Sequence, residues 1–332
     1  MSNVIQTSAA SLSSDTLARM VEEAAARIRD FVTETPLEPV PELAPNAGVK
    51  LFLKMENLQQ TGSFKLRGAS NKILSLDRER VARGVIAASN GNHGMGVAAA
   101  AKRAGIAAEV YVSFQVSTSK AKKIEEYGVQ IRQVGEDPLE AELAARAAAA
   151  KQGKVFISPY NDPEVMAGQG TIAVEMLRQL PAIDALFVAV GGGGLIGGIG
   201  AYMKRVSPRT EIVGCWPENS RVLYESIKAG RIIEVPEQPT LSESTAGGLE
   251  PGSATLDICR SVIDRSILVA EEEILSAMQR VRDIRGWIIE GAAAVAVAAC
   301  LKEAKHYQGK TIGVVICGGN LSDEVRQRLE FS

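Results

Sequence analysis

The residue whose position most strongly suggests chemistry is Lys65, in the stretch 61–69, TGSFKLRGA. Residues 51–57 alternate like a strand, and apolar residues at helical spacing follow from 69 to 76, so we expect Lys65 where a loop enters a helix. Ser63 is the expected cap of that helix. A cation is unfavourable there, because the N-terminus of a helix carries partial positive charge. Lys65 is therefore either an ordinary surface lysine or a desolvated amine that attacks a carbonyl.

Four consecutive glycines, Gly191, Gly192, Gly193 and Gly194, join an apolar strand to a helix. Their N–H groups can approach an anion closely, and the helix adds its positive end, so phosphate is the favoured ligand. The pattern G-x-G-x-x-G of dinucleotide-binding proteins also fits here. That interpretation expects an acidic residue at the end of the next strand, but Glu218 comes only after Pro217. A tight turn without a ligand is the third possibility.

Two other loops follow apolar strands and carry polar groups. The first contains Ser89, Asn90, Gly91, Asn92 and His93, whose hydroxyl, amide and N–H donors suit a carboxylate. His93 by itself is more typical of a structural histidine. The second begins at Cys317 and continues Gly-Gly-Asn. A buried cysteine usually only packs, and the residues that follow Cys317 are what suggest a ligand there.

Composition excludes several classes of function. The 332 residues are 46% apolar and 23% charged with a net charge of −2, which favours an ordinary globular protein and gives no reason to expect nucleic acid or a membrane as partner. Aromatic residues make up only 5%, too few for stacking platforms. Four separated cysteines indicate free thiols in a reducing cytoplasm, and two histidines do not suffice for a His-rich zinc site. The apolar run 292–301 is too short to span a membrane and predicts a buried helix; residues 1–15 lack the features of a signal peptide and are expected to form a frayed arm.

Strands and helices alternate along the chain in two runs, 84–158 and 185–316. Apolar strands without period-two alternation predict an α/β fold with open, mostly parallel sheets covered by helices on both faces. The carboxyl ends of such strands are where ligands bind, and the three loops described above stand there. Strands are expected at 51–55, 84–88, 108–112, 129–134, 155–158, 185–190, 211–215, 267–269 and 311–316, and helices include 16–31, 95–104, 120–127, 139–151 and 170–179.

The order of these motifs resembles that of fold-type II pyridoxal-phosphate enzymes, in particular the serine/threonine dehydratase and serine racemase family. The resemblance covers residues 37–321 and includes two more motifs, AGQGT at 167–171 and EGAA at 290–293. It implies a fold like the tryptophan synthase β chain, with a large cofactor-binding domain from 1–80 and 162–332 and a small domain from 81–161. It also implies a homo-oligomer, expected to be a dimer.

The resemblance implies a role for each motif. Lys65 would form the Schiff base with pyridoxal 5'-phosphate and act as base at the substrate Cα, and Phe64 would pack beside the cofactor. Gly191 to Gly194 would hold its phosphate, Asn92 its ring hydroxyl, and Cys317 would face its pyridine nitrogen. A thiol there should leave that nitrogen largely unprotonated. Ser89, Asn90, Gly91 and His93 would hold the substrate carboxylate.

The sequence departs from the family at three places. Racemase-like members have a second serine where Asn90 stands, so racemisation is not expected. Members with a divalent-cation site have acidic residues where this chain has Trp216 and Val222, so no metal is expected. Tyr160 stands where the family often has Asn or Phe, and its effect on the ring oxygen is left open.

The resulting hypothesis is a lyase that converts threonine or serine to a 2-oxo acid and ammonia by β-elimination. Another β-hydroxy amino acid, such as hydroxyaspartate or phenylserine, and a role in hydroxyectoine breakdown remain alternatives. An amino-acid racemase, a nicotinamide-dependent oxidoreductase that uses the glycine loop and a ligand-sensing domain without catalysis are weighed against it. The lysine nucleophile argues against the last of these.

Overall fold

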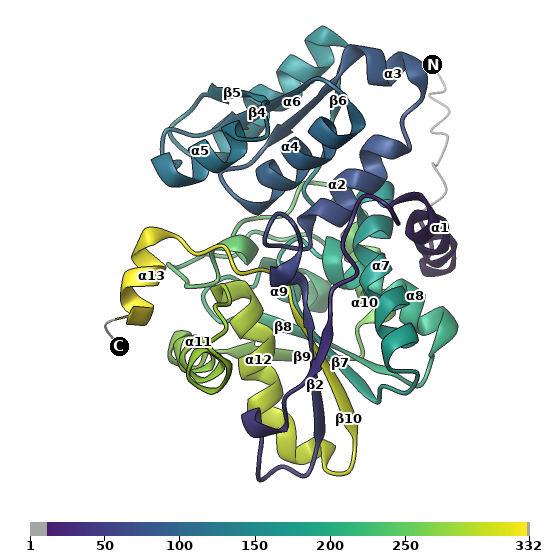
Figure 1. Ribbon diagram of the computed structural model, residues 1–332, viewed down its shortest axis with the longest axis vertical. Helices are drawn as coiled ribbons and strands as arrows, with labels where there is room; N and C mark the ends of the chain where they lie inside the picture. The colour runs from purple at the N-terminus through teal and green to yellow at the C-terminus, as the bar shows by residue number, and fades with distance from the viewer. Residues whose placement is uncertain (1–11, 331–332) are drawn as a thin grey trace, which may run out of the picture.

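A computed structural model describes residues 12–330, and its strands form two sheets flanked by helices (Figure 1). The six-stranded sheet has the order β1 (Leu37–Pro39), β2 (Lys50–Met55), β10 (Thr311–Ile316), β7 (Ala185–Ala189), β8 (Glu211–Pro217) and β9 (Arg265–Val269). The four-stranded sheet has the order β5 (Gln130–Gln133), β4 (Ala108–Val112), β3 (Val85–Ala88) and β6 (Val155–Phe156). Only β1, which pairs with β2, runs antiparallel to its neighbour among these strands. The expected α/β class with parallel sheets is confirmed.

The helices cover the faces of these sheets and fill the space between them. They are α1 (Ser14–Arg27), α2 (Lys65–Leu74), α3 (Arg78–Arg83), α4 (Asn92–Ala104), α5 (Thr118–Glu125), α6 (Pro138–Gln152), α7 (Pro163–Gln179), α8 (Gly194–Val206), α9 (Val222–Ala229), α10 (Thr255–Val262), α11 (Glu271–Arg285), α12 (Gly291–Glu303) and α13 (Asp323–Glu330). Among the described residues, no helix combines the length and the apolarity needed to cross a membrane.

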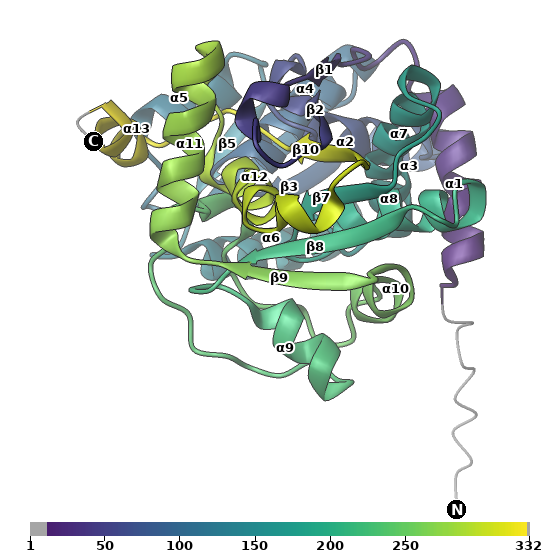
Figure 2. The same ribbon diagram turned by 90° about the horizontal axis from the view of Figure 1, so that it is seen from below.

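Burial explains why the strands lack alternation. Every residue of β3 and β7 is buried, because helices lie against both faces of each sheet. α12 packs against β7, β8, β9 and β10, as the view from below shows (Figure 2), and it is buried over the whole run 291–300. The expected buried helix at 292–301 is therefore confirmed. The predicted domain limits at residues 81 and 161 stay a prediction, although β3 to β6 and their helices lie together at one end of the molecule (Figure 1).

Two predicted helix starts and one predicted helix cap are wrong. α1 begins at Ser14 with Ser13 as its cap, so part of the expected arm is helical; residues 1–11 lie outside the described residues. α7 begins at Pro163, seven residues before the expected start, because Asp162 caps it. α2 begins at Lys65, but Ser63 does not cap it. The backbone of Ser63 is bridged to Gly318, which leaves its hydroxyl without a partner among the described residues.

A buried network of charges fixes the start of α2. Arg67 donates to Glu56 at 2.7 Å and to Glu175 at 2.6 Å, and Lys54 donates to Glu175 at 2.6 Å. Lys54, Glu56 and Arg67 are fully buried. Burial lowers the pKa of Arg67, but the two carboxylates more than offset this and raise it. The network ties β2 and the short helix that follows it to α2 and α7, and so it fixes the backbone two residues from Lys65.

We expect Arg67→Met to lower the free energy of unfolding by roughly 3–5 kcal/mol, because it leaves two buried carboxylates with too few positive partners. Urea denaturation of the cofactor-free protein, followed by circular dichroism, measures the change. Arg178→Met is the matched control, since Arg178 pairs with Glu34 at 2.9 Å on the exposed surface and such pairs contribute little. Equal midpoints for the two variants would contradict the role assigned to the network.

Candidate active site

Three helices begin around one point between the two sheets. α2 starts at Lys65, α4 starts at Asn92 and α8 starts at Gly194. α4 packs closely on α2: a Cβ atom at Gly96 would lie only 3.0 Å from the carbonyl carbon of Lys65. The first N–H groups of a helix have no partner within the helix, so each start offers donors and partial positive charge. The arrangement suits a ligand with more than one anionic group.

The Lys65 amine lies inside a cavity and is only partly exposed. It donates to the carbonyl of Pro159 at 2.9 Å and lies 5.2 Å from the centre of the Phe64 ring. Burial lowers its pKa to about 8, against the opposing influence of Glu290 and Cys317. Near neutral pH the neutral, nucleophilic form of the amine is therefore far more populated than in an ordinary surface lysine.

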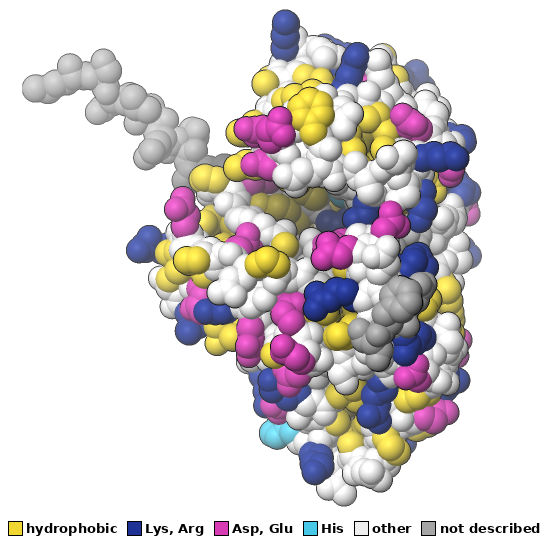
Figure 3. Space-filling model, turned by 90° about the vertical axis from the view of Figure 1, so that its left-hand side faces the viewer, with side chains coloured by type: hydrophobic (Ala, Val, Ile, Leu, Met, Phe, Trp, Pro, Cys, Tyr) yellow, Lys and Arg dark blue, Asp and Glu magenta, His cyan; other side chains and the backbone are white. Residues whose placement is uncertain are grey.

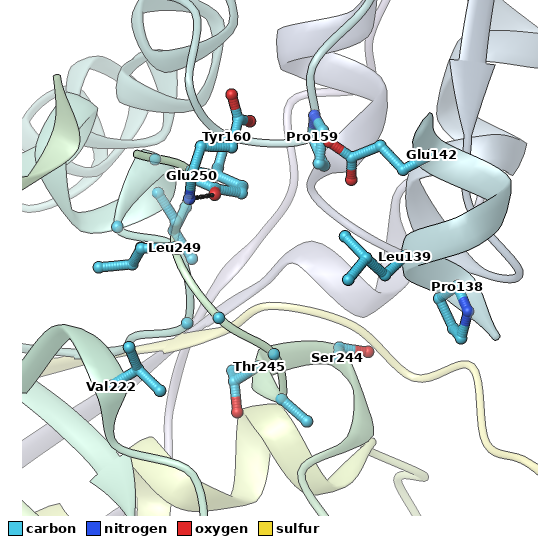
Figure 4. A pocket seen from close by; sticks show the side chains of 18 of the residues that line it. Pro138, Leu139, Glu142, Pro159, Tyr160, Val222, Ser244, Thr245, Leu249 and Glu250 are labelled. Carbon is cyan, nitrogen blue, oxygen red and sulfur yellow. Dashed lines mark hydrogen bonds between the residues drawn. The ribbon is translucent and has the colours of Figure 1, made fainter. Parts of the chain in front are cut away.

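The cavity has a volume of about 1130 Å³ and separates α6 from the six-stranded sheet. The surface is hollowed between the two parts of the molecule (Figure 3). In the close view, Pro138, Leu139 and Glu142 of α6 stand on one side, and Val222 and Leu249 stand across from them (Figure 4). The residues expected in the site that line it are Phe64, Lys65, Gly191, Gly192, Gly193, Gly194 and Cys317.

The glycine loop lines this cavity, and its surroundings leave no room for larger residues. A Cβ at Gly192 would lie 2.5 Å from the Tyr160 ring, and Gly193 has a φ of +87°, which favours glycine. The Tyr160 hydroxyl accepts a hydrogen bond from the Glu250 backbone at 2.9 Å (Figure 4). The ring of Tyr160 thus packs on the glycine loop, and its hydroxyl connects it to the backbone of Glu250.

The loop after β3 lies beside the cavity rather than in its wall. Both ends of the Asn90 amide are bonded: it donates to the Ser113 hydroxyl at 2.7 Å and accepts from the Ser113 backbone at 2.9 Å. The Ser89 hydroxyl accepts from the Gly91 backbone at 3.1 Å. His93 is buried against the Ile157 carbonyl at 2.8 Å, and burial lowers its pKa to about 3, so the ring is neutral. The groups of this loop that can still bind a carboxylate are the N–H groups at the N-terminus of α4.

Asn92 connects this loop to the six-stranded sheet. Its side chain donates to Glu290 at 2.8 Å and accepts from Asn320 at 2.8 Å. The Cys317 thiol donates to the other oxygen of Glu290 at 3.7 Å. The structure therefore brings Asn92 and Cys317, which lie far apart in the sequence, to one buried carboxyl group.

Sequence reasoning noted Glu290 only as part of a motif and assigned it no role. The sequence did contain a signal: Glu290 directly precedes the small apolar residues of α12, so it is expected to be buried, and a buried carboxylate needs polar partners. The cavity-facing residues of α6 carried no such signal. Trp216 lies buried in β8 and Val222 begins α9, and no group of three or more His, Cys, Asp or Glu side chains among the described residues could hold a metal ion.

Comparison with known proteins agrees with this geometry. Residues 28–318 match the family described as pyridoxal-phosphate dependent enzymes. The L-threonine ammonia-lyase of Thermotoga maritima is 39% identical over 309 residues, which is 93% of this chain and 77% of that protein.

Two solved structures share the fold over nearly their whole length. Threonine deaminase isoform 2 of Solanum lycopersicum superposes with a TM-score of 0.90 at 32% identity, covering 96% of this chain and 93% of that one. Maize serine racemase superposes with a TM-score of 0.88 at 33% identity, covering 95% and 96%. Lysine, glycine loop and matched sequence thus agree, and the chain belongs to the family of pyridoxal-phosphate dependent enzymes.

Proposed function

We propose that the protein is an ammonia-lyase that acts on a β-hydroxy L-amino acid, with threonine or serine as the default substrate. The observation that carries the proposal is the Lys65 amine, held inside a cavity with a pKa of about 8 beside the glycine loop. The names of the threonine ammonia-lyase and threonine deaminase relatives support the same reaction. The substrate loses its Cα proton and its β-hydroxyl as water, and hydrolysis of the unsaturated amine then gives a 2-oxo acid and ammonia.

The residues present fit pyridoxal 5'-phosphate. Gly191 to Gly194 leave room for an anion where side chains would collide with Tyr160 and Thr245, and α8 adds its positive end. The Lys65 amine can attack an aldehyde. When bound, the cofactor supplies an electron sink for the carbanion at the substrate Cα.

The remaining roles follow from position. Lys65 holds the cofactor and moves the Cα proton, and Phe64 packs beside the ring. We assign the ring hydroxyl to Asn92 and the pyridine nitrogen to Cys317. The substrate carboxylate is assigned to the loop of Ser89, Asn90, Gly91 and His93, where the N–H groups at the start of α4 do the binding. The His93 ring is neutral, so it would help to shape this loop but would add no positive charge for the carboxylate.

Other proposals stay open to direct measurement. A homodimer and a cytoplasmic location remain predictions, which light scattering and cell fractionation test. A panel of β-hydroxy amino acids, including hydroxyaspartate and phenylserine, assayed for 2-oxo acid decides the substrate. A nicotinamide-dependent oxidoreductase would show no visible absorption band that borohydride removes, and would carry no group on Lys65.

We expect Lys65→Ala to abolish 2-oxo acid formation, because it removes both the attachment of the cofactor and the base at Cα. Loss of a general base alone costs on the order of 10²–10⁴-fold in rate. Borohydride reduction followed by peptide mapping should place the cofactor on Lys65 in the wild type. Lys72→Ala is the matched control, since Lys72 lies in the same helix but pairs with Asp162 at 2.6 Å. A Lys65→Ala enzyme with half the wild-type activity would refute the assignment.

The pH dependence of cofactor attachment tests the environment of Lys65. Burial lowers the pKa of the amine to about 8, so the neutral, nucleophilic form should increase as the pH rises from 7 to 9. Reductive trapping of added pyridoxal 5'-phosphate by the cofactor-free protein should therefore reach half of its maximum near pH 8. A midpoint near the ordinary lysine value of 10.5 would show that the amine is not desolvated.

The presence of Asn90 leads us to expect that the enzyme does not racemise its substrate at Cα. Racemisation needs a base on each face of Cα, and both ends of the Asn90 amide are bonded to Ser113. In deuterated water the wild type should convert L-serine to 2-oxo acid and release almost no D-serine, as a chiral column would measure. Asn90→Ser should gain slow racemisation. If the wild type formed deuterated D-serine as fast as the 2-oxo acid, Asn90 would not prevent proton exchange on the second face of Cα.

A further inference from the structure

Two carboxylates on the wall of the cavity share one positively charged partner. Glu142 belongs to α6, Glu250 belongs to the segment before α10, and both line the cavity together with Arg146. Nη2 of Arg146 lies 2.8 Å from Oε1 of Glu142 and 2.7 Å from Oε1 of Glu250. These three residues, called the charged triad below, therefore carry two negative charges and one positive charge.

The other contacts of the charged triad add no positive charge. The side-chain amide of Asn161 donates to Oε2 of Glu250 at 3.1 Å, and the centre of the Phe156 ring lies 4.3 Å from Cζ of Arg146. Among the described residues, no lysine and no second arginine forms an ion pair with either carboxylate. The buried network around Arg67 has two cations for its two carboxylates, so the charged triad is the less balanced of the two groups.

The hydroxyl of Tyr160 experiences the same excess of negative charge. Burial raises the pKa of Tyr160 to about 12, and a hydrogen bond from the backbone of Glu250 opposes that rise. The charges of Glu250 and Glu142 raise the pKa further, and the charge of Arg146 lowers it. Two of these three side-chain charges are negative, so the space beside the hydroxyl favours a cation.

The charged triad borders the space in which a substrate would meet Lys65. Tyr160 directly follows Pro159, whose carbonyl accepts a hydrogen bond from the Lys65 amine at 2.9 Å. In the close view, Glu142 extends from α6 toward Pro159, and the backbone of Glu250 is bonded to Tyr160 (Figure 4). Apart from Lys65 and the arginine of the triad, no described lysine or arginine lines the cavity. A substrate held at Lys65 therefore has an excess of carboxylates along this side of its binding space.

We propose that, besides threonine and serine, the enzyme takes β-hydroxy L-amino acids whose side chain carries a second amino group, and that the charged triad binds this ammonium group. The inference rests on the proposed function and names a further substrate class for the same site. An ammonium group balances the extra negative charge and donates hydrogen bonds to the carboxylates, which a neutral side chain does not. A second carboxylate, as in hydroxyaspartate, meets charge of its own sign and should make the poorest substrate of the panel.

Binding to the holoenzyme tests this without measuring turnover. L-2,4-diaminobutyrate and L-norvaline have nearly the same shape and differ in a terminal ammonium or methyl group, and neither carries a β-hydroxyl that could leave. Their dissociation constants are measured from the change in the absorption band of the cofactor. The diamine should bind roughly 10- to 100-fold more tightly, the range of a hydrogen bond to a charged group. Equal binding of the two compounds would overturn the inference.

Two variants show whether the charged triad causes the preference. Glu250→Gln and Glu142→Gln each remove the extra negative charge and keep the shape of the side chain, so each should bring the ratio of the two dissociation constants close to one. Glu34→Gln is the matched control, since Glu34 pairs with Arg178 on the exposed surface, and it should keep the wild-type ratio. If one triad variant fails to fold, the other decides, and an unchanged ratio would refute the role of the triad.

Turnover separates this inference from the proposed function. The kcat/KM for 2,4-diamino-3-hydroxybutanoate should exceed that for 2-amino-3-hydroxypentanoate, which has a methyl group in place of the second ammonium. If both compounds gave 2-oxo acid with no preference for the diamine, the inference would fall and the lyase function would stand. If the holoenzyme bound the diamine more tightly but formed 2-oxo acid from no β-hydroxy amino acid, the proposed function would fall instead.

Discussion

The buried ion network of Lys54, Glu56, Arg67 and Glu175 is the constraint on which the site depends. Four charges removed from water lose much of their hydration, and only close pairing of opposite charges compensates for that loss. Arg67 uses its whole guanidinium group, with bonds to two carboxylates. Such a network has few alternative arrangements, so it fixes β2, α2 and α7 relative to one another. The network therefore also fixes the start of α2 and, with it, the position of the Lys65 amine.

Around this fixed start, the site is assembled from the ends of elements rather than from their middles. The amine, the glycine loop and Asn92 each stand at the beginning of a helix, and Cys317 stands at the end of β10. Parallel strands bring their carboxyl ends to one edge, and the helices that follow begin there. Segments from both sheets thus converge without any one of them containing the whole site.

Much of this could be predicted from the sequence, because strong local patterns produced it. Buried strands without alternation predicted parallel sheets, and the strand at 51–55, followed by Lys65, was placed correctly. The start of α7 was missed although Asp162 and Pro163 form a cap and a favoured first residue. The capping role of Ser63 failed for another reason: its backbone pairs with Gly318, and no local pattern reveals a partner 255 residues away.

The hydrogen bond from Lys65 to the Pro159 carbonyl has a consequence for how the two sheets are connected. Pro159 lies between β6 of the four-stranded sheet and α7, which is anchored to the six-stranded sheet side of the molecule. The free amine therefore fastens the crossing segment to the first turn of α2. An aldehyde that takes up this amine leaves at most one N–H on the nitrogen, so its attachment competes with that hydrogen bond. The nitrogen that would hold a carbonyl compound is thus the same atom that ties the first turn of α2 to the segment between the two sheets.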